Sequence, residues 1–134
     1  MNVSLKHRGP DDTGVYTDGP VGLGQQRLAI IDLSPAGHQP MSDAAGKVWI
    51  TFNGEIYNFL ELRQELQKDG AQLRSHSDTE VIIYLYKKYG VDCLSKLRGM
   101  FAFAIWDSRT RELFVARDRL GKKPLFWSLQ NGTL

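Results

Sequence analysis

The feature of this 134-residue sequence that most constrains its fold is a run of seven apolar residues at 100–106. Successive side chains of a strand point to opposite faces, so a strand here would be apolar on both. Such a strand must be covered on both sides. A polar turn at 107–111 and a second apolar segment at 112–117 follow, which predicts an antiparallel hairpin. The sequence therefore predicts a layered domain.

Other strands are predicted from β-branched and apolar segments. Residues 21–33 indicate a strand that leads into the loop Ser-Pro-Ala-Gly at 34–37. Residues 48–52 predict another strand, which we expect to stop at Asn53 and Gly54, a pair that readily takes positive φ. A last strand is predicted to begin near residues 124–127.

Two helices are predicted between these groups of strands. Within 58–68, Phe59, Leu62 and Leu66 recur at helical spacing, and Gly70 lies where a C-terminal cap is expected. The segment Ser-Asp-Thr-Glu at 77–80 has capping-box spacing and opens a helix that runs towards Gly90. This second helix is apolar on more than one face, which predicts burial. A shorter helical piece is expected at 92–97.

The order of elements indicates the fold class. Helices lie between groups of strands joined by short turns, which favours antiparallel sheets with helical cover over repeated βαβ units. We therefore predict an α+β fold of layered antiparallel sheets, within one domain that occupies residues 1–134.

Composition excludes several classes of function. Lys and Arg number 17 against 15 Asp and Glu, and acids interrupt the basic stretches, so nucleic-acid binding is not expected. The apolar run at 100–106 is too short to span a bilayer, so no membrane association is expected. The single cysteine, Cys93, cannot form an internal disulfide, which fits a reducing, cytoplasmic setting.

Six stretches together resemble the glutaminase domain of glutamine-hydrolysing asparagine synthetases, a class II glutamine amidotransferase domain. They are HRGPDD at 7–12, RLAIID at 27–32, FNGEIYN at 52–58, SDTE at 77–80, RGMFAF at 98–103 and ARDRLGKKP at 116–124. The resemblance covers nearly the whole chain. It implies an N-terminal-nucleophile hydrolase fold of αββα type, in which a cysteine exposed at the N-terminus attacks the amide of L-glutamine and its own α-amino group acts as base.

The resemblance also implies a role for each matched residue. Arg27 would clamp the α-carboxylate of glutamine, because a guanidinium offers two parallel donors. Asn53 and Gly54 would form the oxyanion hole. Glu55 and Asp78 would face the α-ammonium group, with Asp78 the better candidate for direct charge pairing. The edge of the slot would be shaped by four further residues, Leu28, Ala29, Ile30 and Ile31.

The sequence departs from the family pattern at both ends. No cysteine lies near Met1, so the resemblance implies a partial domain that lacks its first strand and nucleophile and is inactive alone. No synthetase domain is expected within 1–134, so ATP and Mg²⁺ are expected only in such a domain, and this chain is expected to hold no cofactor or metal. An incomplete sheet leaves an unpaired edge, which is expected to promote self-association.

Several alternatives stay open at this point. Cys93 could replace the nucleophile, but its place in a predicted helix favours an inert, buried thiol. Arg27 could be a structural ion-pair partner of Asp32. The chain could also be a non-catalytic glutamine-binding or protein-interaction module, or part of an amidotransferase that makes another product.

Overall fold

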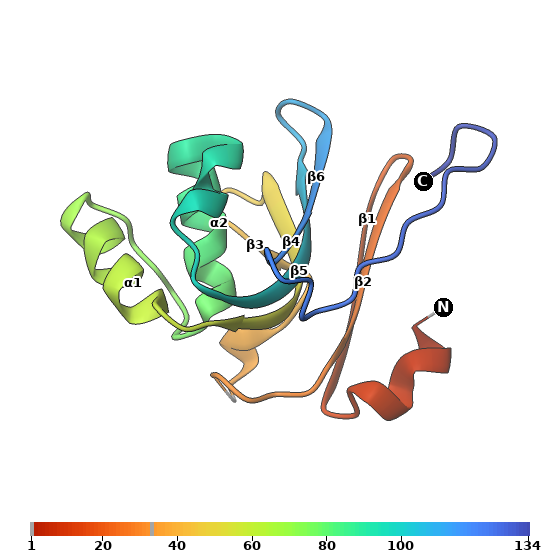
Figure 1. The fold of residues 1–134 in the computed structure, drawn as a ribbon, viewed down its shortest axis with the longest axis horizontal. Helices are drawn as coiled ribbons and strands as arrows, with labels where there is room; N and C mark the ends of the chain where they lie inside the picture. Colours follow the sequence, from red (N-terminus) through yellow and green to blue (C-terminus); the bar gives the residue numbers. More distant parts are fainter. Residues whose placement is uncertain (1, 33) are drawn as a thin grey trace.

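Residues 2–32 and 34–134 are described by a computed structural model, in which three layers pack against one another (Figure 1). The helices α1 (Phe59–Lys68) and α2 (Asp78–Tyr89) cover one face of a four-stranded antiparallel sheet. A two-stranded hairpin, β1 (Asp12–Asp18) and β2 (Val21–Arg27), lies against the other face. The apolar run at 100–106 lies in the middle layer and is covered on both sides, as predicted.

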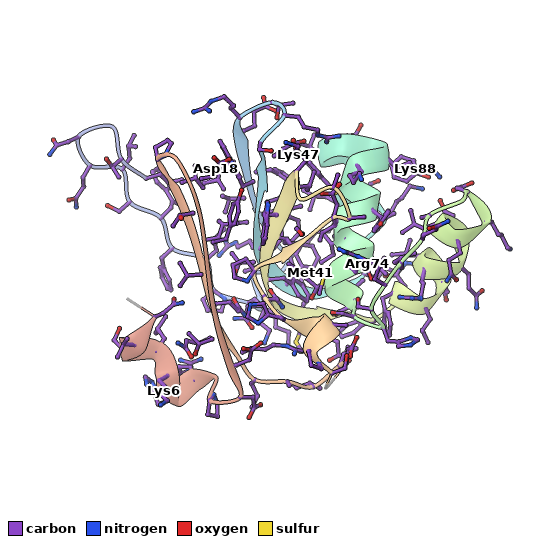
Figure 2. All side chains as sticks on the ribbon, turned by 180° about the vertical axis from the view of Figure 1, so that it is seen from behind. Lys6, Asp18, Met41, Lys47, Arg74 and Lys88 are labelled. Atoms are coloured by element: carbon purple, nitrogen blue, oxygen red, sulfur yellow. The ribbon has the colours of Figure 1, made fainter. Side chains whose placement is uncertain are left out.

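The four-stranded sheet has the order β3-β4-β5-β6, with the bounds β3 Met41–Ser42, β4 Val48–Ile56, β5 Gly99–Asp107 and β6 Glu112–Arg117. Alternation along β4 separates its two faces. Val48, Ile50 and Phe52 are buried in the core beneath the helices. Figure 2 shows side chains filling the space between α2 and this sheet. The opposite face of β4 is turned towards the hairpin.

The hairpin is joined to the sheet mainly by aromatic and polar contacts. The rings of Tyr16 and Trp49 stack with their centroids 3.8 Å apart. Trp106 Nε1 donates to Asp18 Oδ2 over 2.9 Å. Asp18 lies at the tip of the hairpin (Figure 2).

The two α-helices match their predictions closely. Leu62 and Leu66 of α1 are buried, and Gly70 follows the helix with a φ of 89°. In α2, Ser77 is the N-cap and accepts the N–H of Thr79. The predicted capping box is wrong in its second half, because the Glu80 carboxylate binds the N–H groups of residues 74 and 75 instead of the N-cap.

Two predicted strand boundaries and one predicted strand are wrong. Strand β4 does not stop at Asn53 and Gly54, because both pair with β5, opposite Ala102 and Phe101. Strand β2 ends at Arg27, and the rest of the predicted 21–33 segment leaves the sheet, with Leu33 outside the described residues. No strand forms at 124–127, where Phe126 is 90% exposed.

Three 3₁₀ segments complete the described part: η1 Val3–Arg8, η2 Pro35–Gly37 and η3 Gly90–Ser95. The third corresponds to the short helical piece predicted at 92–97, but it begins at Gly90 and ends at Ser95. The architecture is therefore α+β with two antiparallel sheets. Within 2–32 and 34–134, α-helices cover one sheet only, and η1 lies beside the hairpin (Figure 1). No helix in these ranges has the length and apolar character needed to cross a membrane.

Candidate active site

A cavity of about 580 Å³ lies where β2 and β4 diverge at the ends that carry Arg27 and Ile56. This volume is in the range of small-molecule binding sites. The N-terminus of α2 contributes Ser77, Asp78 and Thr79 to its wall. The cavity brings together eight of the nine residues predicted for the site, which are Arg27, Leu28, Ile30, Ile31, Asn53, Gly54, Glu55 and Asp78.

Arg27 is placed at the end of β2 with its side chain 8% exposed. Its Nη2 donates to the carbonyl oxygens of Ile31 at 3.0 Å and Asp32 at 2.6 Å. Nε and Nη1 have no hydrogen-bond partner among the described residues, so they can serve a ligand. The alternative ion pair with Asp32 is wrong, because the Asp32 carboxylate binds Ser34 and the His76 N–H instead.

The edge of β4 that faces away from β5, its outer edge, carries a row of N–H groups beside this cavity. The N–H of Phe52 donates to Gln39 Oε1 at 2.7 Å, and the N–H of Ile56 donates to Asp78 Oδ2 at 3.0 Å. The N–H of Tyr57 points the other way, to Arg98 across the sheet. N–H groups alternate between the two edges of a strand, so the N–H of Gly54 is on the same edge as those of Phe52 and Ile56. It lies between these two hydrogen-bonded groups and faces the cavity.

Asn53 and Glu55 present their side chains on the face of β4 that is turned towards the hairpin. Asn53 is exposed and Glu55 is half-buried, and both line the cavity. Gly54 lies between them, and its lack of a side chain matters: a Cβ there would lie 2.2 Å from Met100 O and 2.7 Å from Phe101 Cα. The glycine therefore permits close approach of β5.

Asp78 is the first residue of α2 and is 3% exposed. Burial raises the pKa of its carboxyl, and the neighbouring Glu55 carboxylate raises it further, although the N–H groups of Ile56 and Thr79 oppose the shift. Two acidic residues, Glu55 and Asp78, thus line the same cavity as Arg27.

The remaining predicted residues form the rim. The side chains of Leu28 and Ile30 are 58% and 74% exposed. Ala29 is the one predicted site residue that does not line the cavity, and its N–H donates to Asp11 Oδ2 at 2.9 Å. It therefore fixes the path of the rim.

Sequence reasoning missed several residues of the wall. Gln25 lies in β2 and Gln39 lies between η2 and β3, and both bind the backbone of β4, which is distant from them in the sequence. Lys122 and Lys123 line the cavity because Asp118 accepts both of their N–H groups. The motif at 116–124 contains both lysines and could have indicated them as site residues, whereas no local sequence pattern indicates the two glutamines.

The thiol of Cys93 is remote from this chemistry. It lies in η3 and not in the cavity wall, it is fully buried, and burial raises its pKa to about 11. The prediction of a buried cysteine is confirmed. Within 2–32 and 34–134, no group of three or more His, Cys, Asp or Glu side chains is arranged to hold a metal ion.

Comparison with known proteins agrees with this arrangement. A family model described as "Glutamine amidotransferase domain" matches residues 1–134. The chain is 48% identical over 131 residues to asparagine synthetase [glutamine-hydrolyzing] 1 of Bacillus subtilis, covering 98% of this chain and 21% of that protein. It is 43% identical to a putative asparagine synthetase [glutamine-hydrolyzing] 2 of Methanocaldococcus jannaschii, covering 95% of this chain and 28% of the relative.

A solved structure shares the fold. Glutamine phosphoribosylpyrophosphate amidotransferase from B. subtilis superposes with a TM-score of 0.70 at 28% identity, over 87% of this chain and 33% of the other. The chain spans only 21% and 28% of the length of the two curated relatives above. The chain thus belongs to the class II glutamine amidotransferase domain family and resembles the N-terminal domain of asparagine synthetases.

Proposed function

We propose that the cavity binds L-glutamine and that, in a protein with a thiol nucleophile and an ATP-using domain, the site supplies ammonia for asparagine synthesis. The observation that carries this proposal is the N–H of Gly54, which has no hydrogen-bond partner among the described residues and lies between the bonded N–H groups of Phe52 and Ile56. A donor fixed in this way suits an oxygen that gains charge during acyl transfer.

The charged residues that line the cavity suit the zwitterionic end of an amino acid. The Nε and Nη1 groups of Arg27, which have no hydrogen-bond partner among the described residues, can each donate a charge-assisted hydrogen bond to a carboxylate oxygen. Asp78 and Glu55 provide negative charge for the α-ammonium group. Because the Asp78 carboxyl has a raised pKa, an incoming ammonium would favour its ionised form.

The side-chain amide of glutamine would then lie along β4. The Gly54 N–H and the Asn53 side chain can both donate to its carbonyl oxygen, which is the oxyanion-hole role predicted from the sequence. Leu28, Ile30 and Ile31 would border the methylene groups at the rim. Ala29 would act only through the path of the backbone.

Glutamine hydrolysis needs a nucleophile as well as this binding site. None of the described residues that line the cavity is a cysteine, and the Cys93 thiol is buried away from it. We expect the 134-residue chain alone to bind glutamine without releasing ammonia. Clear ammonia release that disappears in Cys93→Ser would contradict this expectation.

The binding proposal is tested by removing one charged group from the ligand and its partner from the protein. The ligand 4-aminobutanamide is glutamine without the carboxylate, and glutaramic acid is glutamine without the ammonium group. Each should bind roughly 10–100-fold more weakly than L-glutamine, since charge-assisted hydrogen bonds are lost. Arg27→Ala should abolish the preference for L-glutamine over 4-aminobutanamide and keep its preference over glutaramic acid. Asp78→Asn should abolish the preference for L-glutamine over glutaramic acid and keep its preference over 4-aminobutanamide.

Titration calorimetry or NMR titration measures these dissociation constants. Arg117→Ala is a matched control, because Arg117 is exposed on β6 and does not line the cavity. It should retain both preferences. Equal weakening of all three ligands by Arg27→Ala would mean that the variant only disrupts the loop held by Nη2, and the carboxylate role would be rejected.

A further inference from the structure

The end of β4 lacks a neighbouring strand on its outer edge. Strand β3 pairs with β4 only at Trp49 and Ile50. Beyond Ile50, no described strand accompanies this edge. Phe52 is nevertheless 4% exposed, so its peptide groups need partners inside the protein.

Two glutamine side chains supply those partners. Gln39 Oε1 accepts the N–H of Phe52 at 2.7 Å, and Gln25 Nε2 donates to the Phe52 carbonyl at 3.2 Å. A primary amide carries both N–H donors and a carbonyl acceptor, so it can replace either partner of a peptide group. The pair therefore reproduces, at one residue, what a neighbouring strand would provide.

Each glutamine is itself held in one orientation. Gln39 is 6% exposed, and its Nε2 donates to Thr79 Oγ1 at 3.4 Å. Gln25 Oε1 accepts the hydroxyl of Thr51 at 2.7 Å. The amide oxygen of Gln39 therefore faces β4, and the amide nitrogen of Gln25 does the same.

This arrangement differs from a strand in one functional respect. A continuous partner strand would also pair with Gly54, because Gly54 exposes its N–H on the same edge as Phe52. Two side chains hold Phe52, and Asp78 holds Ile56, but the Gly54 N–H between them stays open to the cavity. The edge is thus fixed on both sides of the Gly54 N–H, which has no hydrogen-bond partner among the described residues.

We propose that Gln39 and Gln25 are positioning residues that replace a neighbouring strand along β4 and hold the Gly54 N–H towards the amide oxygen of bound glutamine. This inference rests on the proposed function. Neither glutamine needs to touch the ligand, because each acts through the Phe52 peptide. Their loss should weaken recognition of the amide oxygen and leave recognition of the α-amino-acid end intact.

The test compares L-glutamine with L-norvaline, which has the same carbon chain without the side-chain amide. Dissociation constants are measured by NMR titration for the unaltered chain and for Gln39→Met, which keeps the side-chain length but removes the hydrogen bonds. We expect the preference for glutamine to fall roughly 3–10-fold, the value of about one hydrogen bond, with norvaline affinity unchanged. Gln25→Met should have the same effect and is the second variant if Gln39→Met fails to fold.

The control for general destabilisation is Ile83→Val. Ile83 is fully buried in α2 and does not line the cavity, so this variant should melt earlier and keep the full preference. A folded Gln39→Met or Gln25→Met that retains the preference would overturn the positioning role. If the unaltered chain shows no preference for glutamine over norvaline, the proposed oxyanion donor fails, and the inference fails with it.

Discussion

Replacement of Gly54 by alanine is the substitution for which the structure gives the clearest cost. A Cβ at this position would lie 2.2 Å from Met100 O and 2.7 Å from Phe101 Cα, both on the backbone of β5. Ordinary contacts begin near 3.4 Å, so the first pair falls short by 1.2 Å. Because no flexible side chain can yield, β4 and β5 must separate locally. Overpacking and one weakened ladder bond together cost about 2–4 kcal/mol.

Chemical denaturation measures this cost, and Gly22→Ala is the matched control. Gly22 lies in β2, is exposed, and a Cβ there would meet no atom within 4 Å. We expect Gly22→Ala to be neutral or to stabilise by up to about 1 kcal/mol. Gly54→Ala should lower the urea midpoint at an unchanged m-value and lower the melting temperature by about 10 °C. Equal stability of the two variants would refute the argument from close backbone approach.

Three further predictions concern buried groups away from the ligand. Hydrogen bonds from the backbone N–H groups of residues 123 and 122 lower the pKa of Asp118 from 3.8 to about 2. The pKa of this carboxyl is therefore lower in the folded chain than in the unfolded chain. Its contribution to stability is complete above about pH 4 and is lost as the pH falls to about 2. An acid titration of unfolding should show this loss in the natural chain and not in Asp118→Asn. Glu80→Gln should destabilise by about 2–3 kcal/mol in urea, because the 1% exposed carboxylate accepts from Arg74 N, Ser75 N and Ser75 Oγ; an unchanged midpoint would contradict this. Cys93, with its pKa raised to about 11, should react with a thiol reagent at pH 8 only as fast as the protein opens, and fast labelling of the native chain would show that the thiol is accessible.

The sequence predicted elements well where the local pattern and the long-range packing agree. The apolar run at 100–106 became a doubly covered strand, and Leu62 and Leu66 became the buried stripe of α1. The first prediction depends on a continuous apolar run and the second on helical spacing, and the tertiary packing agrees with both patterns. Ser77 as an N-cap belongs to the same group, since its bond to Thr79 is made within the first turn.

The sequence failed where a distant partner decides the conformation. Asn53 and Gly54 have a local preference for turns, but nine registered pairs with β5 extend β4 through them. Glu80 satisfies N–H groups of the preceding loop, which no spacing rule indicates. Residues 124–127 have the composition of a strand but no partner among the described strands. Gln25 and Gln39 were overlooked because their bonds to the Phe52 peptide groups join segments that are distant in the sequence.

Binding of L-glutamine in the cavity beside β4 can be measured by following the backbone amides by NMR during titration with L-glutamine. We expect the Gly54 amide to shift most and the residues around Arg27 and Asp78 to shift with the same dissociation constant. Gly54 should also gain protection against hydrogen exchange. Saturating glutamine that leaves the Gly54 amide unmoved, or that shifts only amides remote from this cavity, would contradict binding at this site.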